Sequence, residues 1–199
     1  MTKTFTTVML GISLCLPTLT WADFQTGANA YDRDDYETAL KAWHPLAMEG
    51  HVSAQYRLGL IYEQGQHVTQ DYQEAMKWYH LAADQGHVGA KYRLGVMHYK
   101  GQGILPNYQQ AAKWYCSAAE KGYAKAQTDL GLMYVMGLGV PKDRRRAYMC
   151  FTLAAAQKNA KAAQFQDVIE QTMTAEQIAD AQRLAPRCEE SQHNNSLKQ

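Results

Sequence analysis

Apolar and polar positions along this chain follow a helical period, and the pattern itself recurs every 36 residues. Small residues mark the recurrence in three sets: Ala54, Ala90, Ala126 and Ala162; Gly59, Gly95 and Gly131; and Gly65, Gly101 and Gly137. A period in this range, with small residues at fixed points, is typical of stacked helix-turn-helix units. The pattern therefore predicts an all-α solenoid.

The first helix of each unit is predicted over residues 53–64 and their equivalents. Its apolar side consists of Ala54, Leu58, Ile61 and Tyr62. Gly59 lies inside this helix, where a glycine costs about 1 kcal/mol relative to alanine. We therefore expect another backbone segment to pack too closely for a side chain against Gly59, Gly95 and Gly131.

The second helix is predicted over residues 72–84 and their equivalents. Its buried stripe consists of Ala75, Trp78, Tyr79 and Ala82. Asp71 can cap the free amides of its first turn while Glu74 reaches back to the cap, and Gly86 can end it in the left-handed conformation. A glycine-rich turn at 65–69 joins the two helices.

The two ends of the array depart from the pattern, as capping units should. Before the first full unit, residues 36–50 match only a second helix, with a short partner over 24–31. After the third unit, Asp167 replaces the internal glycine in a helix at 160–171, and a last helix begins at Thr174. We expect about ten helices in a curved, right-handed stack.

The N-terminus is predicted to be a secretory signal peptide, with Lys3 as its positive start, an apolar stretch at 8–16 and a cleavage site at Thr20-Trp21-Ala22. A lipoprotein would need Cys15 as the lipidated residue, which the bulky Leu14 before it disfavours. No later stretch is long enough to span a bilayer, so the mature chain is expected to be periplasmic or secreted. The expected organisation is a signal peptide at 1–22, an N-terminal capping unit at 23–50, three repeats at 51–86, 87–122 and 123–158, C-terminal capping helices at 159–188 and a disordered tail at 189–199.

The first unit resembles the Sel-1-like repeat, a relative of the tetratricopeptide repeat. The matching residues are Ala54, Leu58, Gly59, Tyr62, Gly65, Val68, Asp71, Ala75, Trp78, Tyr79, Ala82, Ala83 and Gly86. The second copy fits as well, whereas the third has Cys150 in place of tryptophan and Lys158-Asn159 in place of the closing glycine. The resemblance extends over residues 31–184 and implies an adaptor, a regulator or a secreted host-interaction factor.

The cysteine-rich branch of that family is associated with cell-wall or β-lactam-like ligands, and it places two cysteines in each repeat. This chain lacks that spacing. It also lacks the H-E-x-x-H, G-x-S-x-G and S-x-x-K motifs, and its 20 Lys+Arg against 19 Asp+Glu leave no electrostatic footprint for nucleic acid. We therefore predict a monomeric, non-enzymatic scaffold that needs no cofactor or metal and binds a protein or peptide partner. The alternative is a cell-wall-active protein that binds or hydrolyses peptidoglycan fragments or β-lactams.

The dipeptides Tyr56-Arg57 and Tyr92-Arg93 are the candidate partner-binding residues. If the first helices line the concave surface, these residues form an aromatic and cationic strip suited to an extended acidic or C-terminal peptide. The third copy interrupts this strip with Thr128-Asp129.

Three histidines need separate interpretations. His51 and His87 recur where second helices end, so an imidazolium there would lie favourably against the negative helix end. A metal site is the less favoured alternative, because equivalent positions of successive repeats lie about a helix diameter apart. His98 projects from a first helix and is either a surface residue or part of the binding face.

A basic run stands at the start of the third unit's second helix and consists of Lys142, Arg144, Arg145 and Arg146. Positive charge at this end opposes the helix dipole. The run either binds an anionic partner such as lipid headgroups or forms a solvated surface, and the second interpretation is favoured because charge runs are common on exposed helices.

The cysteines of the mature chain permit one disulfide and one spare thiol in an oxidising compartment. A bond between Cys150 and Cys188 would attach the C-terminal cap to the third unit and contribute about 3 to 4 kcal/mol. A bond between Cys116 and Cys150, joining neighbouring second helices, is the alternative.

Overall fold

The computed structural model describes residues 21–184, and the side chains of residues 23–184. Most of the predicted signal peptide, the predicted tail and Cys188 therefore lie outside the described residues. The described helices are α1 (Trp21–Tyr31), α2 (Tyr36–Met48), α3 (Val52–Gln64), α4 (Tyr72–Asp84), α5 (Val88–Lys100), α6 (Tyr108–Ala119), α7 (Ala124–Met136), α8 (Arg144–Ala156), α9 (Ala160–Glu170) and α10 (Ala175–Arg183).

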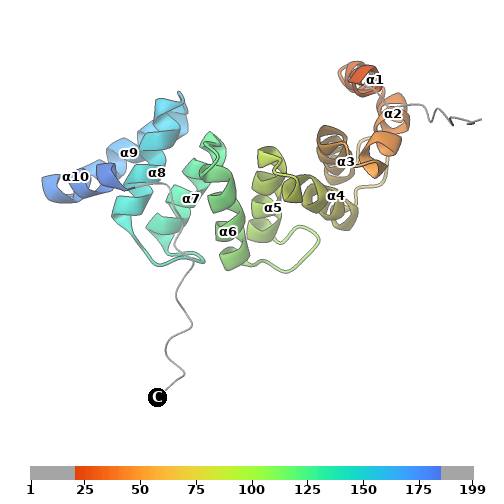
Figure 1. Ribbon diagram of the computed structural model, residues 1–199. Coiled ribbons are helices and arrows are strands. Elements are labelled where there is room, and N and C mark those ends of the chain that lie inside the picture. The colour runs from red at the N-terminus through yellow and green to blue at the C-terminus, as the bar shows by residue number, and fades with distance from the viewer. Residues whose placement is uncertain (1–20, 185–199) are drawn as a thin grey trace, which may run out of the picture.

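From α1 to α9 each helix packs against the next along the chain, and the helices form a curved row with α1 and α10 at its two ends (Figure 1). The last helix, α10, packs back onto α8. The predicted all-α solenoid is thus confirmed, and the predicted helices at 53–64 and 72–84 are α3 and α4. Over residues 21–184, we find no helix with the length and apolar character needed to cross a membrane.

Polar caps and glycines determine where the helices begin and end. Asp71 accepts a hydrogen bond from the Glu74 amide at 3.0 Å at the start of α4, and the Thr174 side chain and Gln177 form a reciprocal capping box at the start of α10. Gly65 ends α3 at a φ of 67°, in the left-handed region that glycine adopts without steric cost. These start and stop signals could be read from the sequence because each acts on its own helix end.

The glycine inside each full unit's odd-numbered helix faces an aromatic ring rather than another backbone segment. A Cβ added at Gly59 would lie 2.5 Å from Cε1 of Tyr79, and one added at Gly131 would lie 2.6 Å from Cε1 of Phe151. Gly95 has the same relation to Tyr115. The expectation of a close backbone was therefore wrong, because the ring from the second helix already occupies the space beside the glycine.

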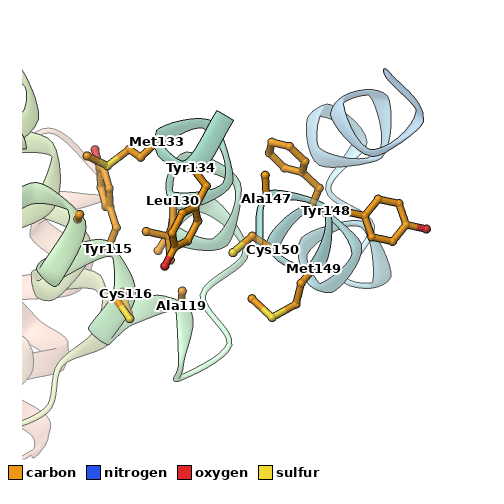
Figure 2. Close-up of a cluster of buried hydrophobic side chains, with 14 of the residues drawn as sticks. Tyr115, Cys116, Ala119, Leu130, Met133, Tyr134, Ala147, Tyr148, Met149 and Cys150 are labelled. Carbon is orange, nitrogen blue, oxygen red and sulfur yellow. The ribbon is translucent and has the colours of Figure 1, made fainter. Parts of the chain in front are cut away.

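Buried side chains form a series of clusters along the row. In the C-terminal cluster, Tyr115 comes from α6, Leu130 and Met133 come from α7, and Ala147 and Cys150 come from α8 (Figure 2). Because each helix packs mainly on its neighbours in sequence, the fold is stabilised unit by unit rather than by one central core.

Candidate functional site

The predicted strip lies on α3 and α5, and its tyrosines are half-buried. The ring of Tyr56 stacks on that of His87, with 4.3 Å between their centroids. The ring of Tyr92 lies 5.1 Å from that of Tyr123, and its hydroxyl donates a hydrogen bond to Oδ2 of Asp129 at 3.0 Å. Both tyrosines therefore bridge neighbouring units while part of each ring stays accessible.

Arg57 reaches from α3 into the N-terminal capping unit. Its guanidinium carbon lies 5.4 Å from the ring centroid of Tyr31 and 5.7 Å from that of Trp43. A guanidinium over an aromatic ring contributes about 0.5 to 2 kcal/mol, depending on its exposure to solvent. The cation predicted for a partner thus already stabilises the contact between α3 and the first two helices.

Arg93 makes the corresponding contact from α5 to α3, but with an acid. Its Nη1 lies 3.3 Å from Oε1 of Glu63, and the other oxygen of Glu63 accepts a hydrogen bond from the Tyr79 hydroxyl at 2.5 Å. The Glu63 side chain is only 10% exposed, against 32% for Arg93. Burial, followed by the Glu63 charge, raises the pKa of Tyr79, so its hydroxyl remains a donor. The three groups form a connected network across the first junction.

Asp129 replaces the strip's cation in the third unit but keeps a contact with the preceding unit. It stands at the position of Arg57 and Arg93, and it accepts the hydrogen bond from Tyr92 of the preceding unit. Burial raises the pKa of Asp129, although the hydrogen bond from Tyr92 acts in the opposite direction. The strip of aromatic and cationic side chains ends before the third unit, because Thr128 is buried and Asp129 is an acid.

Glu63 was not predicted as part of the site. In the structure, contacts between units recur at a separation of 30 residues. The Arg93 to Glu63 pair has this separation, and so does the hydrogen bond from Gln85 to Gln55. The sequence repeats every 36 residues, so nothing in it marked an acid 30 residues before a strip arginine as its partner.

His98 is half-buried on α5, and its Nδ1 is buried with no hydrogen-bond partner among the described residues. Burial, and secondarily the nearby His80, lower the pKa of His98, which favours the neutral ring. Between residues 21 and 184, no group of three or more His, Cys, Asp or Glu side chains could hold a metal ion.

His51 and His87 do act as caps, but through a neutral nitrogen at the start of the following helix. Nδ1 of His51 accepts a hydrogen bond from the Ala54 amide at 3.2 Å, and Nδ1 of His87 accepts one from the Ala90 amide at 3.0 Å. The expected imidazolium against the preceding helix end is wrong for this geometry, because a protonated Nδ1 cannot accept. Burial also lowers the pKa of His87.

The basic run divides into two pairs. Arg146 lies 3.5 Å from Asp143, and Arg145 lies 3.8 Å from Asp180 on α10, so these two arginines stabilise the C-terminal end. Lys142 and Arg144 are exposed, and neither forms an ion pair with any residue in the described part of the chain. The predicted solvated surface thus applies to only half of the run.

A groove of about 570 Å³ opens beside Lys142 and Arg144, between α7, α8 and α9. We call it the third-junction groove. Its apolar lining includes Leu132, Val135, Phe151, Phe165, Val168 and Ile169. None of its lining residues within the described range is acidic. It is therefore an apolar site with positive charge at its edge, which the sequence pattern did not reveal.

The bonding state of Cys150 differs from both predicted pairings. Cys150 is a free thiol with 2% of its surface exposed, packed in the C-terminal cluster beside Tyr134 (Figure 2). Burial raises its pKa to about 12, so the reactive thiolate is suppressed. The predicted bond from Cys150 to Cys188 is therefore wrong, and so is the alternative from Cys150 to Cys116. Cys116, unlike Cys150, is disulfide-bonded.

The solved structures similar to this chain include two repeat proteins. The Sel1 repeat protein from Oxalobacter formigenes is 32% identical, with a TM-score of 0.70 and coverage of 73% of this chain and 60% of that one. The protein c5321, described as a protective antigen of uropathogenic Escherichia coli strains with an SLR fold, is 26% identical, with a TM-score of 0.50 and coverage of 81% and 43%. This chain thus spans less than two thirds of the length of either structure. No curated protein matches it.

The repeat assignment rests on three consecutive matches. Residues 52–87, 88–123 and 124–159 each match the Sel1 repeat, and together they make up more than half of the 199 residues. Each matched segment holds one odd-numbered helix and the even-numbered helix that follows it. This chain therefore belongs to the Sel1 repeat family.

Proposed function

We propose that this protein is a non-catalytic scaffold that binds a protein partner in the periplasm or outside the cell. Proteins with Sel1 repeats are generally protein-interaction scaffolds. The observation that carries the proposal for this chain is the row of partly exposed Tyr and Arg side chains along α3 and α5, each held in place by a neighbouring unit. Side chains that are already ordered lose less conformational entropy on binding, which favours recognition.

The partner-binding test compares two charge-matched variants. Arg57→Gln with Arg93→Gln removes both strip cations, whereas Lys113→Gln with Lys121→Gln removes two exposed cations from α6 and the turn after it. After cross-linking in the cell envelope, we expect a specific partner to be lost from the strip variant and retained by the control. Urea unfolding shows whether the strip variant is still folded at the assay temperature. A partner retained equally by both variants would argue against the strip.

Export is the second part of the proposal and is supported by the signal-peptide pattern at residues 1–22. We expect the protein purified from its native cells to begin at Asp23. N-terminal sequencing of that protein, together with cell fractionation, measures this directly. An intact Met1 in a cytoplasmic fraction would contradict export and leave the scaffold proposal standing. Nothing in the described residues favours the cell-wall-active alternative.

A further inference from the structure

Two equivalent helix positions lie at each of the three junctions between successive odd-numbered helices from α3 to α9, but the residues differ. At the first junction they are Glu63 of α3 and Arg93 of α5, which form the ion pair at 3.3 Å. At the second they are Tyr99 and Asp129. At the third, between α7 and α9, the equivalent residues of the 36-residue repeat are apolar, and that junction holds the third-junction groove.

The second junction has a hydrogen bond across it and an aromatic pair beside it. The ring of Tyr99 meets that of Tyr108 edge to face at 5.4 Å, and Asp129 accepts the hydrogen bond from Tyr92. Arg144 stands where Tyr108 would be one unit later, so the third junction has no aromatic lid at this position. Lys142 likewise stands at the position that Pro106 has in the second unit. Both cations are thus particular to the third junction among the three.

Val135 and Phe165 leave the third junction open. Phe165 packs on Phe151 at 5.4 Å between centroids, which covers one side of its ring, but Val135 has no polar group with which to bridge the gap. Val135 remains 42% exposed, and Val168 on α9 remains 64% exposed. Exposed aliphatic side chains that line a concave site favour an apolar ligand.

The charge at the groove is unbalanced in one direction. Lys142 and Arg144 have no ion-pair partner within residues 21–184, and none of the described residues that line the groove is an acid. A ligand that placed a carboxylate beside these cations would form charge-assisted hydrogen bonds, which are about twice as strong as neutral ones. The volume of about 570 Å³ is in the range of small-ligand and side-chain pockets.

We propose that the third-junction groove binds a segment of a partner protein in which aliphatic or aromatic side chains are flanked by Asp or Glu. The apolar side chains contact Val135, Phe165 and Val168, while the carboxylate pairs with Lys142 and Arg144. This inference rests on the proposed scaffold function and adds to it the chemistry of the partner. A protein segment fits better than a fully enclosed small molecule, because the exposed valines leave the groove open to solvent along one side.

The probe is a fluorescein-labelled, C-terminally amidated peptide, Gly-Glu-Glu-Leu-Phe-Leu-Gly, added to the purified protein and followed by fluorescence anisotropy. A second peptide has Gln in place of both Glu, and a third has Ser in place of the apolar residues. We expect the acidic apolar peptide to bind at least about tenfold more tightly than the Gln peptide, and the Ser peptide not to bind. Rising salt should weaken the binding of the acidic apolar peptide most.

Protein variants separate the two parts of the groove. Lys142→Gln with Arg144→Gln should lower the affinity for the acidic peptide about tenfold and leave that for the Gln peptide unchanged. The matched control, Lys113→Gln with Lys121→Gln, should change neither. Val135→Glu with Phe165→Arg rebuilds the first junction's ion pair inside the groove, so it should abolish binding of both the acidic apolar peptide and the Gln peptide.

Three results would overturn the inference: no binding of the acidic apolar peptide up to about 1 mM, equal binding by the wild type and the Lys142→Gln with Arg144→Gln variant, or binding of sodium dodecanoate without binding of the peptide. The last would identify the groove as a fatty-acid site. If the peptides fail but a cross-linked partner is still lost from the strip variant, the groove inference falls and the scaffold proposal stands.

Discussion

At the junction between α3 and α5, Glu63 and Arg93 form an ion pair, whereas at the junction between α7 and α9 Val135 and Phe165 occupy the same positions and leave a groove. Both pairs stand on the same framework of small residues and aromatic rings. A repeat fold tolerates this difference because each junction is stabilised by its own contacts. The N-terminal junction is thus closed by a polar network, and the C-terminal one is free to receive another molecule.

The largest expected effect comes from breaking the closed junction. Glu63→Ala leaves the Arg93 guanidinium and the Tyr79 hydroxyl without their buried acceptor. We expect a loss of about 2 to 3 kcal/mol in the free energy of unfolding, less than for a fully buried pair because Arg93 is one third exposed. Urea unfolding followed by circular dichroism measures it.

A double variant sharpens that result. Glu63→Val with Arg93→Phe gives the first junction the residues of the third, so no buried charge is left unpaired. We expect it to cost less than Glu63→Ala alone, because removing both partners of a buried pair avoids the uncompensated charge. A loss below about 0.5 kcal/mol for Glu63→Ala would show that the ion pair does not close this junction.

Replacing the internal glycine with alanine should cost a different amount of stability at the two junctions. An added methyl group would lie 2.5 Å from Tyr79 at Gly59 and 2.6 Å from Phe151 at Gly131, so both variants are overpacked. Tyr79 is also held by Glu63, whereas Phe151 borders the open groove and can move into it. We expect Gly59→Ala to cost about 2 to 3 kcal/mol and Gly131→Ala about 1 to 2. Equal losses in urea unfolding would contradict the difference in freedom between the two rings.

The helix caps supply a pH-dependent comparison. His87 caps α5, and Asn159 caps α9 at the equivalent position through a hydrogen bond from the Ala162 amide at 3.1 Å. Because burial lowers the folded-state pKa of His87, its contribution to stability is present above the unfolded value near 6.5 and is lost as pH falls through the folded value.

His87→Asn should therefore match the wild type at pH 7.5 and exceed it by up to about 1 kcal/mol at pH 5, the usual value of a cap. Unfolding curves at the two pH values test this. Part of the stability that the wild type loses between pH 7.5 and pH 5 should also be lost in the variant, since the pKa of His98 is lowered as well. A variant less stable than the wild type at pH 5 would show that the packing of the His87 ring contributes more to stability than its cap does.

The smallest effect is expected at the end of the third unit. Lys158 adopts a φ of 63°, where the first unit has Gly86 at 91°. A non-glycine residue in the left-handed region is strained, so Lys158→Gly should stabilise the protein by about 0.5 to 1 kcal/mol. Gly86→Lys is the reciprocal control and should destabilise by a similar amount. Thermal melting of both variants distinguishes them, and shifts in the same direction would rule out the conformational explanation.

The structure confirms the parts of the prediction that depend on neighbours in sequence. The boundaries of α3 and α4 follow from Asp71, Gly65 and a helical period, all of which act within one or two turns. The partner of Gly59 was predicted wrongly, because a glycine indicates a close approach without saying whether a backbone or a ring makes it. The strip arginines were found, but their acceptor Glu63 was not.

The 36-residue period and its helix signals were enough to identify an all-α solenoid of this family, because each repeat carries its own caps, turns and packing residues. Only the tertiary structure decided that Glu63 meets Arg93, that Cys150 stays a free buried thiol and that Val135 and Phe165 frame an open groove. These outcomes depend on contacts between units, where stacking brings together side chains 30 residues apart and where the residues of both units decide whether a junction closes.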